Sequence, residues 1–407
     1  MPRGGSQNLN PRNLGSAASA WAKHFFSRVF AAQSSLFWRI ILVTTPMLII
    51  GVIMVLSSSS VDSILNNNGN GFATFGKQLL YASVGAVLLL VASLVSPDFY
   101  QRHAMKIFWS VLALQASILF LGVSVNGNKA WLDIGFTKIQ PSEFLKIGLI
   151  LAIAWHMEDR QHLIHDPRSY RNFLVFVPLG VIGAATLITS DVGTAMILVL
   201  IVLVMVWLSG VPAGSMRLPL LVVAVAGFIA MNAAASRLGR IKAFFDPASD
   251  VTGLYTDQTQ HGIWALAAGG IQGVGLGLSK MKWTWIPEVE NDFIFAIIAE
   301  ELGMIGAVTV ICLFVYLGVL IRRVAQRANT VFKRMLVIGI GTWLIGQALI
   351  NIAVVLNLFP VLGVPLPLIS AGGSSLISGL GAIGIVLAIE RDNHLNETNR
   401  GRARVKR

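Results

Sequence analysis

The chain has 407 residues, of which 55% are hydrophobic and only 12% carry a charge. A soluble protein of this composition could not cover its surface with polar side chains, so the sequence predicts an all-α polytopic membrane protein. The formal net charge is +12 at pH 7. The basic residues form no stripe interleaved with aromatic residues, which a nucleic-acid partner would favour. The positive charge is therefore interpreted as a signal of membrane topology and of attraction to anionic lipid.

Ten apolar runs are long enough, or nearly so, to cross a bilayer, which needs roughly 20 residues per helix. They are predicted at 40–56, 79–95, 107–123, 143–157, 173–189, 192–209, 218–235, 293–321, 335–356 and 366–389. An N-terminus on the inside places most of the 31 basic residues in inner segments. The positive-inside rule then predicts that both termini are cytoplasmic, with a long outer loop between the seventh and eighth helices.

Polar segments flank the predicted membrane domain, residues 36–390. Residues 1–35 lack apolar periodicity and are expected to form a mobile cytoplasmic tail, and residues 391–407 form a short basic cytoplasmic tail that is expected to be disordered. A turn-rich outer loop is predicted at 57–70. The only cysteine, Cys312, excludes an intramolecular disulfide and is interpreted as a small buried hydrophobe. The spacing of the histidines predicts no transition-metal site.

The most informative stretch reads W-I-P-E-V-E-N-D, directly before an apolar run, and ends at Asp292. A carboxylate fixed where water meets hydrocarbon is costly unless it is paired or functional. Two interpretations stay open from this stretch alone. Asp292 is either an N-cap or first-turn acid that stabilises the following helix, or a catalytic group at the membrane surface.

Two further polar features lie in or beside predicted spans. Glu143 and Lys146 are three residues apart, so they share a helix face and are expected to pair. The pair is either a functional site or a contact that fixes helix packing. Asp191, in the sequence T-S-D-V-G-T, is either a turn or cap residue or part of a polar cavity.

Two segments cannot be regular spans. Within the predicted outer segment 236–292, the run G-I-W-A-L-A-A-G-G-I-Q-G-V-G-L-G is apolar but too short to cross, which predicts a re-entrant or interfacial element. A dinucleotide-binding loop would follow a strand, and no strand is predicted before these glycines. They are therefore interpreted as sites of close helix approach or as a flexible gate. Segment 357–375 contains three prolines and ends in G-G-S-S, which predicts a packing hinge or a wet cavity.

Four motifs together resemble the SEDS family (shape, elongation, division and sporulation), most closely its cell-division branch. They are Gln140–Glu143 with Lys146, Asp191–Thr194, Pro287–Gly303 and Pro365–Ser375, and the resemblance covers about residues 36–390. It implies a peptidoglycan glycosyltransferase that polymerises lipid II on the outer face of the cytoplasmic membrane, at the division septum. It also implies that Asp292 is the essential acid, and that a class B penicillin-binding protein and other division proteins are partners.

The residues suit the chemistry that the resemblance implies. Transfer of the lipid-linked sugar onto the GlcNAc 4-hydroxyl needs a base, for which Asp292 is the candidate, and cations for the departing diphosphate. Because the donor has a good leaving group, a single inverting displacement is expected. A divalent cation, Mg²⁺ or Mn²⁺, is an open addition. The substrate-binding candidates are Lys129, Trp131, Gln140, Asp191, Arg237, Arg240, Lys242, Gln258, His261, Lys280, Lys282, Glu288, Ser370, Gly372, Gly373 and Ser374.

Three alternatives remain open at this point. A lipid II flippase or another transporter would also have ten spans, broken helices and intramembrane charges, although no inverted repeat is evident. A non-enzymatic scaffold for division proteins would not need Asp292. The elongation branch of the same family would perform the same chemistry, and only the polar N-terminal tail favours the division branch over it.

Overall fold

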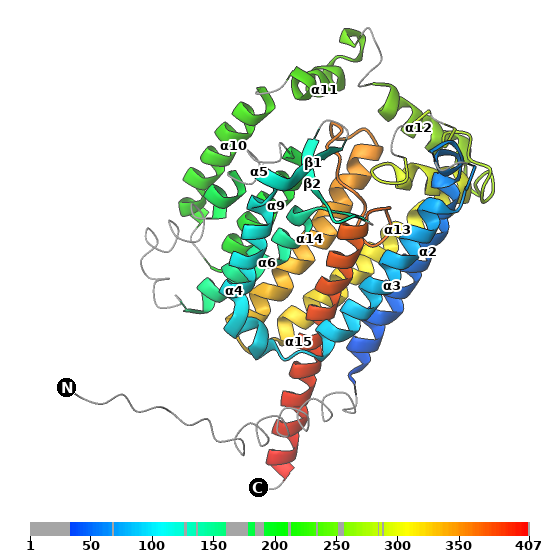
Figure 1. Cartoon of the computed structure of the whole chain (residues 1–407). Coiled ribbons are helices and arrows are strands. Elements are labelled where there is room, and N and C mark those ends of the chain that lie inside the picture. Colours follow the sequence, from blue (N-terminus) through cyan, green and yellow to red (C-terminus); the bar gives the residue numbers. More distant parts are fainter. Residues whose placement is uncertain are drawn as a thin grey trace.

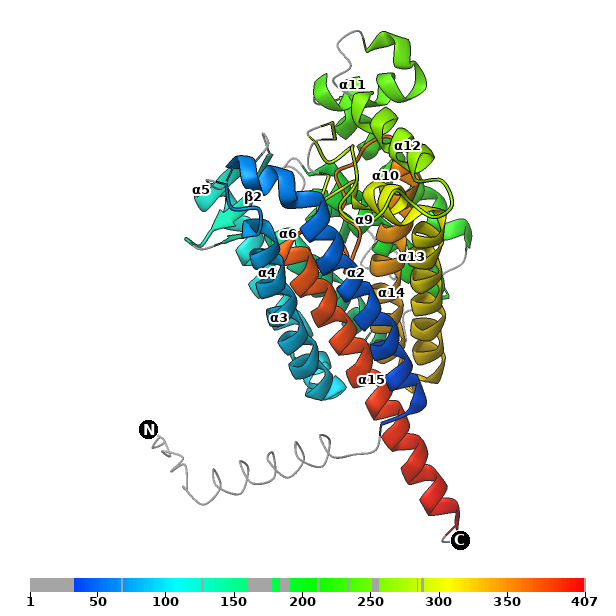
Figure 2. The same cartoon turned by 90° about the vertical axis from the view of Figure 1, so that its right-hand side faces the viewer.

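Long helices run side by side through the molecule and carry its loops to two opposite ends (Figures 1 and 2). The computed structural model describes residues 33–66, 69–125, 128–135, 137–159, 178–183, 191–210, 213–232, 235–250, 256–283, 285–286 and 289–405. The helices are α2 (Ser35–Asn66), α3 (Ala73–Leu94), α4 (Pro97–Ala116), α5 (Ile118–Leu121), α6 (Pro141–Asp159), α9 (Val192–Leu208), α10 (Arg217–Asn232), α11 (Ala235–Phe245), α12 (Asp257–Gly269), α13 (Ile294–Arg327), α14 (Val331–Val355) and α15 (Gly373–Val405).

The two ends of the bundle differ in character. The end at which α2 begins and α15 finishes is called the tail end here, and the opposite end, which carries the short strands, α12 and segment 356–372, is called the loop end (Figure 1). Helix α15 packs along α3, α4 packs along α6, and α14 lies against α6, α9 and α13. Side chains between these helices form one continuous apolar core. The loops of the loop end are therefore mounted on a rigid base.

Six of the described helical segments are long and apolar enough to cross a membrane. They are Ser35–Leu65, Ala73–Leu94, Pro97–Leu121, Ile294–Arg327, Val331–Val355 and Gly373–Asn399, while the apolar segments Val192–Leu208 and Arg217–Ile229 are shorter. Large apolar side chains such as Phe120, Phe228 and Val87 are exposed on the outside of the bundle. Such a surface suits lipid rather than water. The predicted span at 173–189 lies outside the described residues except for a helical piece at 178–183.

The loop end contains a small antiparallel sheet that was not predicted, although the described structure is otherwise mainly helical, as predicted. Strands β1 (Gly122–Val125), β2 (Asn128–Asp133) and β3 (Lys138–Ile139) are ordered β1-β2-β3. Val123 lies opposite Trp131, and Leu132 opposite Ile139. The sequence predicts a loop here, because each strand is too short to show a clear alternation of apolar and polar residues.

Helix α2 is longer than predicted, and α15 begins later than predicted. The loop predicted at 57–70 is wrong, because α2 continues to Asn66. The serines there satisfy their hydroxyl groups inside the helix, as Ser59 does by donating to the carbonyl of Val55 (2.6 Å). The last span begins at Gly373 rather than at 366, because the preceding segment contains Pro365 and Pro367.

The tail predicted to be disordered is also helical, because α15 continues through the polar sequence to Val405. Ion pairs with the α13–α14 turn hold this part of α15. Arg327 lies 2.8 Å from Glu390 and 2.7 Å from Glu397, and Lys333 lies 2.8 Å from Asp392. The interpretation of Cys312 as buried is wrong as well, since its side chain is exposed on α13.

Helix α13 changes direction at Gly303, whose φ of 67° is in the left-handed region. The break frees backbone groups, and the glycine-rich segment after α12 satisfies them. The amides of Val274 and Gly275 donate to the carbonyls of Glu300 (2.9 Å) and Glu301 (3.0 Å). A Cβ atom at Gly273 would lie only 2.1 Å from the carbonyl oxygen of Glu301. The glycines thus permit close approach, as one of the two interpretations predicted.

Replacing Gly303 by alanine should destabilise the protein. The left-handed backbone costs about 1–3 kcal/mol for an L residue, and the new Cβ would lie 2.3 Å from the amide nitrogen of Gly273. Thermal unfolding in detergent should show a lower midpoint for Gly303→Ala. The matched control is Gly76→Ala in α3, where no atom lies within 4 Å of the added Cβ. Equal midpoints for both variants would contradict this account of the break.

Candidate active site at the loop end

Asp292 lies immediately before α13, and its side chain is partly buried. The N-cap position of α13 is occupied by Phe293, so Asp292 is not the N-cap residue. Its carbonyl oxygen accepts a hydrogen bond from Nδ2 of Asn351 (2.8 Å). Its carboxylate faces segment 356–372, since a Cβ atom at Gly363 would lie 3.5 Å from Oδ2 of Asp292. The carboxylate is therefore positioned at the loop end, between the start of α13 and segment 356–372.

Two buried side-chain amides on α14 hydrogen-bond to the backbone of the proline-rich segment, residues 357–375. Gln347 donates from Nε2 to the carbonyl of Pro365 (2.8 Å), and Asn351 donates from Nδ2 to the carbonyl of Val364 (2.7 Å). Both amide side chains are almost fully buried, at 0% and 1% exposure. Four residues apart, they lie on one face of α14. Because Asn351 also binds the carbonyl of Asp292, one side chain joins the proline-rich segment to the start of α13.

The predicted pairing of Glu143 and Lys146 is confirmed. Nζ of Lys146 lies 2.8 Å from Oε1 of Glu143, and the two residues are 1% and 2% exposed. Lys146 also donates to Oε1 of Gln347 (2.9 Å) and lies over the ring of Trp343, with Nζ 5.0 Å from its centroid. The indole of Trp343 donates to the same Gln347 oxygen (2.9 Å). The ion pair thus orients the amide that holds Pro365, and it acts on the site through Gln347.

Asp191 is confirmed as a cap and also takes part in a polar contact between loops. Its carboxylate accepts the Thr194 amide (2.9 Å) at the start of α9, and its Oδ2 accepts Nε2 of Gln140 (3.2 Å). The Gln140 amide in turn donates to Oγ of Ser374 (2.9 Å). A Cβ atom at Gly193 would lie 2.4 Å from the carbonyl oxygen of Leu362. These contacts bring the first, second and fourth motifs together at the loop end.

Ser370 and its neighbours complete the link to the Asp292 stretch. Oγ of Ser370 accepts the Leu366 amide (2.8 Å), which closes a tight turn in the proline-rich segment. The amide of Ala371 donates to the carbonyl of Glu290 (2.9 Å). Gly373 lies against Tyr81 of α3, where a Cβ atom would be 2.8 Å from the ring. Side chains larger than hydrogen at Gly373 would therefore separate α15 from α3.

A second cluster of buried carboxylates fastens α12 and its following loop to α13. The Ser57 hydroxyl donates its single hydrogen to the Glu301 carboxylate, with Oγ 2.6 and 2.7 Å from the two carboxylate oxygens. Glu300 accepts hydrogen bonds from the Lys280 amide (2.9 Å) and the Ser279 hydroxyl. Lys282 lies 3.7 Å from Glu301. With its Nζ donating to the carbonyl of Gly277 (2.6 Å) and 7% exposure, Lys282 belongs to this buried cluster. The cluster fixes the first part of α13, which follows Asp292 in the chain.

The other predicted binding residues are spread around the loop end. Lys129 on β2 donates to the carbonyl of Leu119 (3.0 Å), and Trp131 is partly buried on the same strand. His261, on α12, lies beside Trp285 with ring centroids 5.3 Å apart. Gln258 is partly buried on α12, the side chain of Lys280 is exposed, and Gly372 directly precedes α15.

Helix α11 stands out beyond the bundle, where its neighbours are α10 and η4 (Pro247–Ser249) (Figures 1 and 2). Its exposed Arg240 and Lys242 are therefore not gathered beside Asp292. Glu288 and the side chain of Arg237 lie outside the described residues. Within the part of the chain that the structure describes, no three His, Cys, Asp or Glu residues gather closely enough to hold a metal ion, so no metal ligand is assigned.

The polar residues that the sequence interpretation missed are Gln347, Asn351 and Ser57. The two amides carry a signal that could have identified them, because they are four residues apart within an otherwise apolar span. Ser57 carries no comparable signal, since its role depends on a partner 244 positions away.

Known proteins resemble this chain over most of its length. A family model described as Cell cycle protein, covering FtsW, RodA and SpoVE, matches residues 37–395. The probable peptidoglycan glycosyltransferase FtsW of Mycobacterium tuberculosis is 33% identical over 386 residues, which cover 93% of this chain and 72% of that protein. The stage V sporulation protein E of Bacillus subtilis is 33% identical over 362 residues, 86% of this chain and 96% of that protein.

The fold is similar to that of a solved structure described as a peptidoglycan synthase complex that coordinates polymerization and crosslinking. A chain of that complex has a TM-score of 0.70 and 25% sequence identity to this chain. The match covers 88% of this chain and 98% of the other.

Neutralising only one partner of the buried ion pair should destabilise the protein more than neutralising both. Glu143→Gln or Lys146→Met leaves one buried charge uncompensated, which costs about 3–5 kcal/mol. The double variant leaves no unpaired charge at this position. Thermal unfolding of the two single variants and the double variant gives the coupling free energy. Strictly additive losses would show that the two side chains do not stabilise each other.

Removing the Asn351 amide should loosen the proline-rich segment. Asn351→Leu leaves the carbonyls of Asp292 and Val364 without their donor, at about 1–3 kcal/mol for each buried carbonyl left unsatisfied. Hydrogen exchange of peptides covering 357–372 should become faster, and the unfolding midpoint should fall. Leu349→Ala, an exposed position on the same helix, is the control. Unchanged exchange in Asn351→Leu would contradict the bridging role.

Proposed function

Since the chain belongs to the Cell cycle protein family of FtsW, RodA and SpoVE, we propose that it is a peptidoglycan glycosyltransferase that polymerises lipid II. Relatives named as probable peptidoglycan glycosyltransferases of the FtsW type support the reaction and favour the cell-division branch. The observation that carries the proposal within this chain is the placement of Asp292. Its partly buried side chain lies just before α13, and Asn351 donates a hydrogen bond to the backbone carbonyl of the same residue.

In the proposed reaction, Asp292 is the general base. It removes the proton of the GlcNAc 4-hydroxyl of the acceptor while the oxygen attacks the anomeric carbon of the donor. The bond to the undecaprenyl diphosphate breaks in the same step, so the configuration inverts and the diphosphate leaves as an anion. Lys129 and Lys280 are exposed cations at the loop end that would compensate for this charge.

The proposal places the loop end on the outer face of the cytoplasmic membrane and the tail end in the cytoplasm, with ten spans in total. The distribution of charge supports this orientation. Arg322, Arg323, Arg327, Lys333 and Arg334 surround the α13–α14 turn at the tail end, and such cationic turns remain inside. Lipid II carries its sugar on the outer face when it is polymerised, which puts Asp292 on the side of the substrate.

A class B penicillin-binding protein is the proposed partner, at the division septum. The similarity to a chain of a peptidoglycan synthase complex supports a partner that crosslinks the new strands. Joint assembly would place the two active sites on the same side of the membrane. The growing glycan could then pass from one to the other without crossing it.

Asp292→Asn should abolish polymerisation of lipid II, by at least about 100-fold, because the loss of a general base removes a contribution of 10²–10⁴. A gel-based assay of the purified protein, with and without the partner, measures glycan chains directly. The unfolding midpoint should stay close to that of the wild type. Asp257→Asn, an exposed carboxylate on α12, is the matched control and should remain active. Full activity of Asp292→Asn would remove the catalytic assignment, and movement of labelled lipid II without glycan formation would favour a carrier.

A further inference from the structure

Segment 271–283, which follows α12 at the loop end, exposes a run of large apolar side chains. Ile271, Leu276, Leu278 and Trp283 are 64%, 57%, 65% and 61% exposed. Burying these side chains would be favourable, so a contiguous surface of this kind marks contact with lipid or with another protein.

The segment is fixed to α13 just after the break in that helix. The amide of Met304 donates to the carbonyl of Gly270 (2.9 Å), and the amide of Ile305 donates to the carbonyl of Ile271 (3.3 Å). Residues 294–301 of α13, before this point, are all buried, whereas the side chains of Met304 and Ile305 are exposed. The exposed face of α13 therefore begins where the segment is attached.

The exposed face of α13 has the length of a hydrocarbon core. From Met304 a stripe of exposed apolar side chains continues through Val308, Val315 and Val319 to the exposed Arg323. The rise from Met304 to Arg323 is about 29 Å at 1.5 Å per residue. A bilayer has a hydrocarbon core of about 30 Å. The stripe is therefore the part of α13 that faces lipid, and its loop-end limit lies at Met304.

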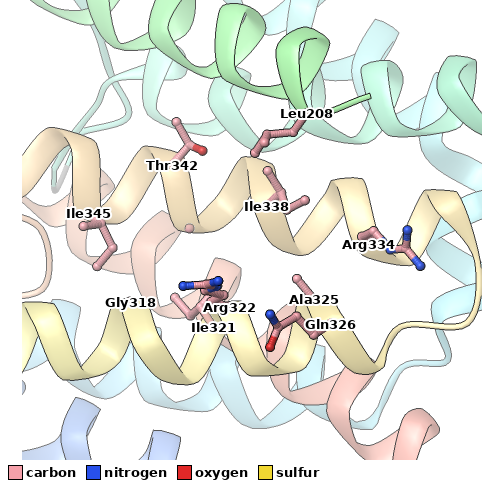
Figure 3. A pocket seen from close by; sticks show the side chains of 11 residues that line it. Leu208, Gly318, Ile321, Arg322, Ala325, Gln326, Arg334, Ile338, Thr342 and Ile345 are labelled. Atoms are coloured by element: carbon pink, nitrogen blue, oxygen red, sulfur yellow. The ribbon is translucent and has the colours of Figure 1, made fainter. Parts of the chain in front are cut away.

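The arginines of the groove between α13 and α14 do not mark the opposite limit. Arg322 turns from α13 into this groove beside Thr342, whereas Arg334 lies nearer the turn between the two helices (Figure 3). The tail-end limit of the stripe is Arg323, which is exposed and does not line the groove.

Helix α2 gives the same loop-end limit independently. Its Arg39 is exposed at the tail end, and its Ser57 donates to the carboxylate of Glu301 (2.6 Å). The rise from Arg39 to Ser57 is about 27 Å. The exposed Leu42 and Ile49 lie between these two residues. Two helices thus place the edge of the hydrocarbon core at the level where the segment is bound.

We propose that segment 271–283 lies in the interfacial layer of the membrane at the loop end. Ile271 and Leu278 reach the outermost hydrocarbon, and the indole of Trp283 lies among the headgroups with the exposed Lys280. Tryptophan is enriched at membrane–water interfaces, and apolar side chains next to a cation are typical of interfacial segments. This composition, and the continuity of the surface with the stripe of α13, favour lipid over a partner protein.

This contact ties the candidate active site to the membrane surface. The segment continues directly from α12, and a Cβ atom at Gly262 of α12 would lie 3.1 Å from the ring of Phe293, the residue after Asp292. The inference requires that the bundle spans a membrane, and it is independent of the proposed glycosyl transfer.

Spin labels on the purified full chain in phosphatidylcholine liposomes test the position of the segment. Cys312, the only cysteine, is exposed within the stripe of α13 and is the deep reference. In a Cys312→Ser background, Leu278→Cys and Trp283→Cys place labels on the segment, and Asp257→Cys places one at the exposed start of α12 as the control in water. Oxygen enters lipid and a nickel chelate stays in water, so the ratio of their collision rates with a label reports its depth. The ratio at Leu278→Cys should be higher than at Asp257→Cys and lower than at Cys312, and Trp283→Cys should lie between Asp257→Cys and Leu278→Cys.

Three results would overturn the proposal. A ratio at Leu278→Cys equal to that at Asp257→Cys would show a segment in water, and a ratio equal to that at Cys312 would show a re-entrant segment within the hydrocarbon core. Slow collisions with both reagents would show a surface covered by protein. Asp292→Asn combined with Leu278→Cys should leave the ratio unchanged, which separates this inference from the proposed reaction. The label at Trp283→Cys decides the matter if Leu278→Cys does not fold.

Discussion

The arrangement at the loop end depends on buried side-chain amides that satisfy backbone groups where helices are interrupted. Within an apolar bundle there is no water to replace a lost helical hydrogen bond, and each unsatisfied carbonyl is costly. Gln347 and Asn351 supply donors to Pro365, Val364 and Asp292. These donors project from the regular helix α14. Their hydrogen bonds therefore fix the irregular segments relative to that helix. The backbone of Asp292 is in this way tied to a regular helix.

The second interruption, at Gly303, meets the same requirement by different means. There the backbone groups freed from α13 bond to the glycine-rich segment after α12, and the carboxylates of Glu300 and Glu301 are held by hydroxyl and amide donors. The first part of α13 is thus fixed at both ends, by Asn351 before it and by this cluster after it. These contacts fix the backbone next to Asp292, the proposed catalytic acid.

Charge is distributed differently at the two ends of the molecule. At the loop end, the buried pair of Glu143 and Lys146 is enclosed by helices and acts through Gln347. At the tail end, the cations of the α13–α14 turn divide between two faces. Arg327 and Lys333 bind α15, whereas Arg322 and Arg334 line a groove between α13 and α14.

The sequence by itself determined the membrane class, most helix positions, the pairing of Glu143 with Lys146 and the cap at Asp191, because these follow from composition and from contacts within a few residues. The tertiary structure alone decided which segments meet. The link from Lys146 through Gln347 to Pro365, and that from Ser57 to Glu301, join positions far apart in the chain, and local periodicity carries no record of such partners. The errors have different causes. The strands pair locally but are too short to show a clear alternation. Ser59 is satisfied within its own helix. The helical tail is held by ion pairs with a turn far away in the sequence.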